Sequence, residues 1–119
     1  MKKKYNFTLT QQVSESISIE FLDEAGSPRA LTGYEFKLDC KKNYNELEPQ
    51  FTLSSADNTI VLDATNTNKI TLYFNHELTK TLNFDKAEYD LITYLPDKSK
   101  VEVLMSGTVT LNRTITSLD

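Results

Sequence analysis

The chain has 119 residues, 39% hydrophobic and 25% charged, which is the size and composition of one folded domain. Its formal net charge of −4 disfavours a protein that holds the phosphate backbone of nucleic acid against a basic face. A single cysteine, Cys40, excludes an internal disulfide. No apolar run approaches the ~20 residues that span a bilayer, so we expect no membrane segment.

The N-terminal segment combines a basic start with a strand pattern. Lys2, Lys3 and Lys4 form the one local basic run, which is most simply a solvated tail; the alternative is an electrostatic tether. The next six residues alternate apolar and polar, which predicts a strand and differs from the continuous apolar core of a signal peptide. We therefore expect an N-terminal arm or first strand over 1–13 and one β-sandwich domain over 14–119.

Period-two alternation continues through most of the chain. Tyr34, Phe36 and Leu38 alternate with charged residues, which places one face of a strand on a core and the other in water. β-Branched and aromatic residues are abundant, as is typical of sheets. Further strands are predicted over Ile17–Phe21, Tyr34–Cys40, Gln50–Ser54, Thr59–Asp63, Ile70–Phe74, Ala87–Leu95, Lys100–Met105 and Thr108–Ile115.

The segments between these strands carry turn residues. Asp23–Pro28 and Asn43–Pro49 read as loops because of their Gly, Pro and Asn content. Hairpin turns are predicted at Ser55–Asn58, Asn66–Asn68 and Pro96–Ser99.

One stretch, His76–Leu82, breaks the alternation. It spaces two leucines four apart, as a helical turn does, and predicts a short helical crossover between strands of different sheets. No long helix follows any strand, so parallel βαβ units are not expected. The predicted fold is all-β: an immunoglobulin-like antiparallel β-sandwich of about 7–9 strands with one short helical crossover.

The residue types that usually carry catalysis are scarce. His76 is the only histidine, at the start of the predicted helical turn, and Cys40 falls on the inward face of its strand. Nucleophilic catalysis needs a nucleophile beside a base, and a zinc site needs three or four Cys or His ligands. The three glycines are too far apart for a phosphate-binding loop. We predict a protein that is not an enzyme and that uses no cofactor.

Acidic residues gather in two places. Asp85, Glu88 and Asp90 lie close together, as do Glu46 and Glu48, and paired carboxylates can bind calcium or act as acid and base. Neither group has the spacing of a calcium loop, and alternating strand positions converge poorly. We interpret both as solvated charge, with a weak ion site as the alternative.

The aromatic residues divide into two sets. Most fall on inward strand positions and are predicted core, namely Tyr5, Phe7, Phe21, Phe36, Phe74 and Tyr89. Tyr44 lies in a loop and Tyr73 on the outward side of its strand, where a tyrosine can anchor an interface or can simply be exposed. The predicted interaction residues are Lys2, Lys3, Lys4, Tyr5, Tyr44 and Tyr73.

The C-terminal third carries a recognisable series of motifs. A strand with Tyr89-Asp90-Leu91 leads to a hairpin, and a second strand runs through Gly107 and Val109. This order resembles small virion β-sandwich domains of bacteriophages, and the plan from Ser14 to Ile115 is similar to the N-terminal domain of phage baseplate upper proteins. Within that plan, we expect Gly107 to allow a bulge or bend where the last strand switches sheets. We expect Val109, Leu111 and Ile115 to fill the core.

The resemblance implies a structural component of a bacteriophage particle, such as a tail, baseplate or fibre-attachment adaptor. Its partners would be other virion proteins, met in multiple symmetric copies, with no nucleic acid, membrane or small-molecule substrate. It would be made in the host bacterial cytoplasm and reside in the virion. Baseplate upper proteins continue into a long C-terminal part, so this chain would be a stand-alone version of the module.

Other functions stay open. A capsid decoration protein could use the same fold, and a phage-encoded inhibitor of a host defence protein is an alternative for a small acidic protein, although dense acidic runs are missing. A carbohydrate-binding module is a further alternative that lacks tryptophan for sugar stacking. For a virion protein, the N-terminal arm Met1–Thr10, basic at its start and strand-forming after, could add a strand to an adjacent subunit.

Overall fold

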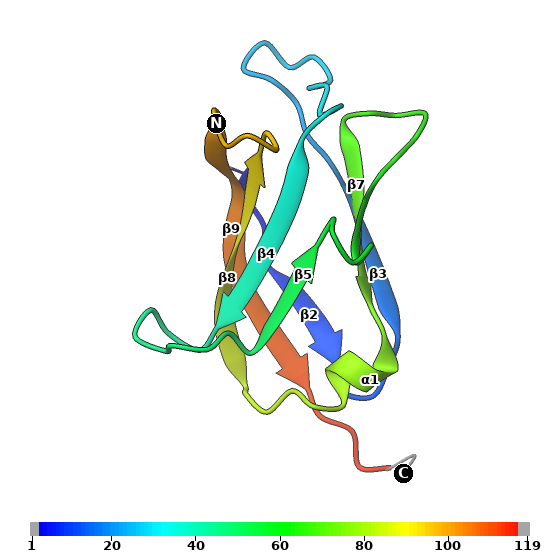
Figure 1. The fold of residues 1–119 in the computed structure, drawn as a ribbon. Helices are drawn as coiled ribbons and strands as arrows, with labels where there is room; N and C mark the ends of the chain where they lie inside the picture. Colours follow the sequence, from blue (N-terminus) through cyan, green and yellow to red (C-terminus); the bar gives the residue numbers. More distant parts are fainter. Residues whose placement is uncertain (1–2, 117–119) are drawn as a thin grey trace.

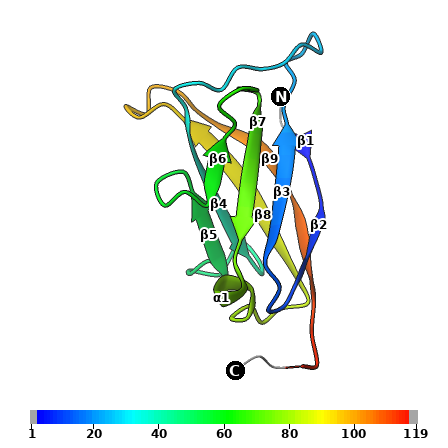
Figure 2. The same cartoon turned by 90° about the vertical axis from the view of Figure 1, so that its right-hand side faces the viewer.

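The computed structural model describes residues 3–116, which form a sandwich of two β-sheets (Figures 1 and 2). Sheet A has the strand order β1–β9–β8–β4–β5, with β2 also paired to β9, and sheet B has the order β3–β7–β6. The elements are β1 (Lys3–Lys4), β2 (Phe7–Thr10), β3 (Glu15–Glu20), β4 (Glu35–Lys41), β5 (Phe51–Ser54), β6 (Ile60–Leu62), β7 (Lys69–Phe74), α1 (His76–Thr79), β8 (Lys86–Tyr94) and β9 (Val101–Asn112). The predicted all-β sandwich with a short helix is confirmed.

The core lies between the sheets and is built by the alternation seen in the sequence. In β4 the apolar residues Phe36, Leu38 and Cys40 are buried while their neighbours face outward. Strands β7 and β8 follow the same rule. Because side chains of a strand alternate between faces, each strand contributes every second residue to the core.

The helical crossover is confirmed, although it is shorter than predicted. Helix α1 joins β7 of sheet B to β8 of sheet A. Asn75 caps it: the side-chain oxygen accepts a hydrogen bond of 2.8 Å from the backbone N–H of Leu78. The chain then continues through Leu82, whose side chain is buried in the core.

Two of the three predicted hairpin turns are confirmed and one is wrong. The turn at 96–99 joins β8 to β9, and the turn at 66–68 joins β6 to β7. The turn at Ser55–Asn58 joins β5 to β6, which lie in different sheets. Turn residues indicate that the chain reverses direction. They do not indicate whether the two flanking strands lie in the same sheet or in different sheets.

The last strand differs from the prediction in two ways. It is continuous from Val101 to Asn112, so Gly107 marks no switch between sheets. The bulge lies elsewhere: Leu91 pairs with Met105 and Ile92 with Val103, which leaves Leu104 as an extra residue. As a result two consecutive residues of β9 are buried.

The prediction that Ile115 fills the core is also wrong. The strand ends at Asn112, and the Ile115 side chain is fully exposed beyond it. Val109 and Leu111, which precede the end of the strand, are buried as predicted.

The N-terminal segment is part of sheet A, and it is parallel to β9 rather than antiparallel. Lys3 pairs with Met105 and Phe7 with Val109, so β1 and β2 keep one register along β9. The interruption between them falls opposite Gly107. The prediction of an entirely antiparallel sandwich is therefore wrong for the pairing of β1 and β2 with β9. In this structure the N-terminal strand is held within its own chain.

Gly107 has a steric role at the interruption. A Cβ atom there would stand 2.0 Å from the carbonyl oxygen of Tyr5, so only glycine leaves room for this backbone group. The same carbonyl accepts a hydrogen bond of 2.5 Å from the hydroxyl of Tyr89, which pairs with Gly107 in the sheet. The Asn6 side chain accepts from the N–H of Thr108 at 2.9 Å. These contacts fix the N-terminal strand in its place beside β9.

Candidate interaction surfaces

The two residues considered for nucleophilic chemistry occupy different environments. Cys40 is buried in β4, and desolvation raises the pKa of its thiol to about 12. A thiol with that pKa stays protonated at neutral pH and is a poor nucleophile. His76 lies at the start of α1, half-exposed, with Nε2 3.1 Å from the Glu77 carboxylate.

The acidic residues near the start of β8 also have different surroundings. Asp85 is exposed and lies 3.5 Å from the Arg113 guanidinium, while Glu88 and Asp90 point outward from β8. Among residues 3–116, no group of three or more His, Cys, Asp or Glu side chains is placed to hold a metal ion.

The predicted interaction residues lie in separate regions. Lys2 is outside the described residues, and Lys3 and Lys4 form the exposed strand β1. Tyr5 is half-buried against the core. The side chains of Tyr44 and Tyr73 are exposed, but they lie on different sides of the sandwich: the first next to sheet A, the second on the outer face of sheet B.

The motif residues that carried the family resemblance have structural positions. Tyr89, Leu91 and Val109 are buried, and Asp90 points outward from β8. Together with Gly107 they lie in the paired strands β8 and β9. Tyr89 and Gly107 also contact the N-terminal strand, through the Tyr5 carbonyl group.

The outer face of sheet A carries an apolar patch, which we define as Ile92, Tyr94, Val101 and Val103. Ile92 pairs directly with Val103, and Tyr94 with Val101. Val101 is 57% exposed and Val103 39% exposed. Cross-strand neighbours stand close enough to form one continuous surface. The patch is therefore a contiguous apolar area at the end of sheet A that holds the 96–99 turn.

At the other end of sheet A, where Lys41 pairs with Glu88, the 42–50 loop joins β4 to β5 and presents two hydrophobic side chains to solvent. Tyr44 is 90% exposed and Leu47 is 91% exposed. Glu46 holds the loop: its carboxylate accepts from the backbone N–H of Lys42 and from the side-chain amide of Gln50, both at 2.8 Å. The loop thus presents the exposed side chains of Tyr44 and Leu47, and hydrogen bonds within the loop hold its shape.

A hollow of about 280 Å³ separates the loop from the sheet. Tyr44 and Lys41 line one part, Asp39 and Asp90 another, and Val103 connects the hollow to the apolar patch. Asp39 pairs with Asp90 across β4 and β8. Apolar, acidic and basic groups therefore meet on one side of the molecule.

The opposite face of the sandwich belongs to sheet B. On sheet B, Ser18 and Thr71 share a side-chain hydrogen bond of 3.0 Å. Tyr73 borders a hollow of about 320 Å³ that Ser14 and Asn75 also line. No described side chain of the predicted set besides Tyr73 belongs to this face.

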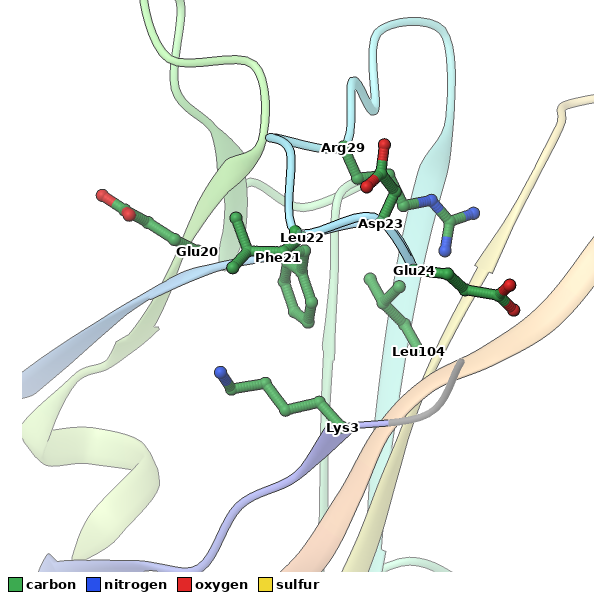
Figure 3. Close-up of a pocket in the computed structure, with 9 residues that line it drawn as sticks. Lys3, Glu20, Phe21, Leu22, Asp23, Glu24, Arg29 and Leu104 are labelled. Atoms are coloured by element: carbon green, nitrogen blue, oxygen red, sulfur yellow. The ribbon is translucent and has the colours of Figure 1, made fainter.

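A third hollow, of about 550 Å³, opens between the sheets on the side where β1 and β3 are the edges (Figure 3). Leu104 and Phe21 are buried at its base, and Leu22 is exposed at its rim. The Lys3 side chain lies beneath the Phe21 ring in this view. Arg29, also at the rim, is ion-paired with Glu102.

Sequence reasoning missed the exposed residues Leu22, Leu47, Val101 and Val103. A signal was present for the patch, because β8 and β9 carry apolar residues at consecutive positions, Leu91-Ile92 and Val103-Leu104. Apolar residues on both faces of a strand indicate that both faces meet apolar surroundings. For Leu47 and Leu22 the loop sequences gave no comparable signal.

Comparison with known proteins adds no relationship: no protein-family model matches the chain, and no curated protein matches it in sequence. Within residues 3–116 no helix is long and apolar enough to cross a membrane. Functional proposals therefore rest on the surfaces described above and on the motif resemblance in the sequence.

Proposed function

We propose that this chain is a non-catalytic protein-binding module that serves as a structural component of a bacteriophage particle. The observation that carries the binding part is the hollow on the outer side of sheet A, which Val103 of the apolar patch and Tyr44 of the 42–50 loop both line. The patch, the hollow and the loop together form the surface. We call this surface the sheet A interface.

The chemistry of the sheet A interface suits a protein partner. Aromatic anchors with few rotatable bonds dominate the energetics of many interfaces, and here Tyr44 stands on a loop that Glu46 already holds in shape. Such a loop loses little conformational entropy on binding. The charged hollow beside it, with Asp39 and Lys41, supplies the polar rim that sets the orientation of a partner.

The phage setting is supported by the motif resemblance of the C-terminal third. A tail, baseplate or fibre-attachment adaptor meets its partners in symmetric copies, so a modest surface acts many times over. A capsid decoration protein would use the same surface on a different lattice. The setting and the surface are separate parts of the proposal and have separate tests.

The test of the setting is quantitative mass spectrometry of purified particles of the phage that carries the gene. We expect the chain at a fixed copy number relative to the major capsid protein. Its absence from particles, with the chain abundant in the infected cell, would refute the virion proposal and favour an intracellular role such as inhibition of a host defence protein.

The test of the surface uses paired substitutions. Val101→Thr with Val103→Thr keeps two β-branched residues in β9 and removes apolar groups from the patch, and Tyr44→Ser removes the loop anchor. Val61→Thr is the matched control, because Val61 is also 39% exposed but lies on sheet B. We expect incorporation to fall about tenfold or more with the first set and to stay unchanged with the control. Equal incorporation of all variants would refute the proposed surface.

A further inference from the structure

The two sheets of the sandwich have unequal widths. Sheet A is five positions wide, since β1 and β2 follow one another along β9, and sheet B is three strands wide. The 550 Å³ hollow lies on the side where the edge of sheet A is β1 and β2 and the edge of sheet B is β3. Sheet A is therefore incompletely covered there.

The edge of β3 offers backbone hydrogen-bonding groups on that side. The Phe21 N–H donates to the Asn68 carbonyl at 2.9 Å, in the same register as the β3–β7 pairs. Antiparallel strands alternate between residues that bond to the neighbour and residues that bond away from it. The N–H and C=O groups of Ile17 and Ile19 thus face β7, while those of Ser16, Ser18 and Glu20 point away from it.

The edge also lacks the usual protection against strand pairing. Natural edge strands carry central charges, proline or a bulge. Strand β3 reads Glu-Ser-Ile-Ser-Ile-Glu, with charges only at its ends, and it pairs with β7 in one unbroken register of six residues. Among the strands of residues 3–116, β7 is its one neighbour.

The hollow beside this edge has an apolar base. Leu104 reaches it because the bulge opposite Leu91 and Ile92 places an extra residue in β9. Phe21, the first residue after β3, meets it from the other sheet, as Figure 3 shows. A strand laid along β3 would direct alternate side chains toward this base.

We propose that the β3 edge and the adjoining hollow form a docking site for an extended segment of a partner protein, which adds a fourth strand to sheet B. Alternate residues of this segment are apolar, and one of them is seated against Leu104 and Phe21. This site is separate from the sheet A interface and depends on other residues.

The charges at the rim define the partner further. Arg29 is ion-paired with Glu102, and the Asp23 carboxylate accepts hydrogen bonds from the N–H groups of its own turn. Among the described residues that line the hollow, Glu20 and Glu24 remain as acidic rim residues, against one lysine, Lys3. Charge complementarity therefore favours a basic residue next to the apolar anchor of the partner segment.

A second copy of the chain fits the site less well. If β3 paired with β3 of another copy, both strands would continue to direct Ile17 and Ile19 into their own sandwiches. No apolar side chain of β3 would then be available for the hollow. A segment of a different protein with one exposed apolar face supplies both the backbone hydrogen-bonding groups for β3 and an apolar side chain for the hollow.

The test starts from a displayed library of peptides of about nine residues, in which Val, Ile, Leu, Phe or Tyr alternates with Thr or Lys; about six extended residues match the length of β3. We expect enrichment of clones with a basic residue beside the central apolar position. An enriched peptide is then added to the isotopically labelled full chain, and amide hydrogen exchange is followed by NMR. We expect protection to rise about tenfold or more at Ser16, Ser18 and Glu20.

Two proline variants locate the binding edge. Ser18→Pro removes an N–H that points away from β7, and it should weaken peptide binding about tenfold or more. Thr52→Pro is the matched control, because Thr52 holds the equivalent outward position on β5, the edge of sheet A, and we expect unchanged affinity. If Ser18→Pro lowers stability, Ser18→Lys adds a central edge charge while keeping the N–H, and it should weaken binding of Lys-containing peptides as well.

Results of three kinds would overturn the proposal. The first is a library with no enrichment of alternating peptides. The second is amide protection that arises outside β3, or equal loss of binding in Ser18→Pro and Thr52→Pro. The third is a dimer, detected by light scattering, that Ser18→Pro dissociates, because a second copy would then occupy the edge. Each result leaves the tests of the sheet A interface unaffected, since those use residues of β9 and the 42–50 loop.

Discussion

Replacing Gly107 with alanine tests the steric account of the N-terminal strand. The added Cβ would stand 2.0 Å from the Tyr5 carbonyl oxygen and 2.7 Å from its carbonyl carbon. A carbon and a carbonyl oxygen in contact normally stand roughly 3.3 Å or more apart. The backbone of β1 and β2 must therefore move by more than about 1 Å, because the obstructing atoms are backbone rather than a flexible side chain.

The energetic cost follows from two contributions. Forcing an extra methyl group into a packed site costs about 1–3 kcal/mol. The displacement also breaks the 2.5 Å hydrogen bond from the Tyr89 hydroxyl to the Tyr5 carbonyl, worth about 1 kcal/mol. We expect Gly107→Ala to lower the free energy of unfolding by about 3 kcal/mol.

Urea unfolding followed by circular dichroism measures this cost. Gly33→Ala is the control: Gly33 has φ +88° and nothing within 4 Å of an added Cβ, so its cost is backbone strain of about 1 kcal/mol. Tyr89→Phe should be less than additive with Gly107→Ala, because both act on the same carbonyl. A Gly107→Ala variant that loses no more stability than Gly33→Ala would refute the reasoning.

Three further predictions concern charge and exposure. Arg29 donates to Glu102, a hydrogen bond that lowers the pKa of this carboxyl; the stabilisation is present at neutral pH and is lost as pH falls through the carboxyl range. Because both groups are partly exposed, Glu102→Gln should cost about 0.5 kcal/mol at pH 7 and nothing near pH 3, measured by urea unfolding at each pH. Burial raises the pKa of Cys40 to about 12, so iodoacetamide should modify it only after unfolding; labelling of the folded chain detected by mass spectrometry would contradict this. Glu46→Ala should increase amide exchange in the 42–50 loop and weaken partner binding through Tyr44, while the melting temperature stays within a few degrees.

The sequence was sufficient to predict the elements whose signals are local. Alternation from Tyr34 to Cys40 defined a strand and its buried face, and the turn at 96–99 defined a hairpin. The helical crossover was visible because two leucines replaced period two with a spacing of four. These features depend on the chain's own periodicity rather than on a distant partner.

The features that were missed depend on which segments meet. Alternation in Phe7–Thr10 predicts a strand but says nothing about a parallel partner about a hundred residues away, and the role of Gly107 follows only from that pairing. The bulge at Leu104 is likewise a property of two strands together. Candidate surfaces share this origin: Tyr44 was predicted from its isolation in a loop, whereas the patch exists only once Val101 and Val103 stand opposite β8.

The parallel pairing of β2 with β9 has a mechanical consequence. The N-terminal end of β1 and the C-terminal end of β9 lie at opposite ends of the sandwich, as Figure 1 shows. Tension applied between these ends would pull β2 and β9 in opposite directions along a shared axis, so that their hydrogen bonds are sheared together. Strands pulled apart from one end would instead separate one bond at a time. Stretching this chain therefore requires simultaneous rupture of the whole β2–β9 contact, a geometry that lets the domain transmit force without extending.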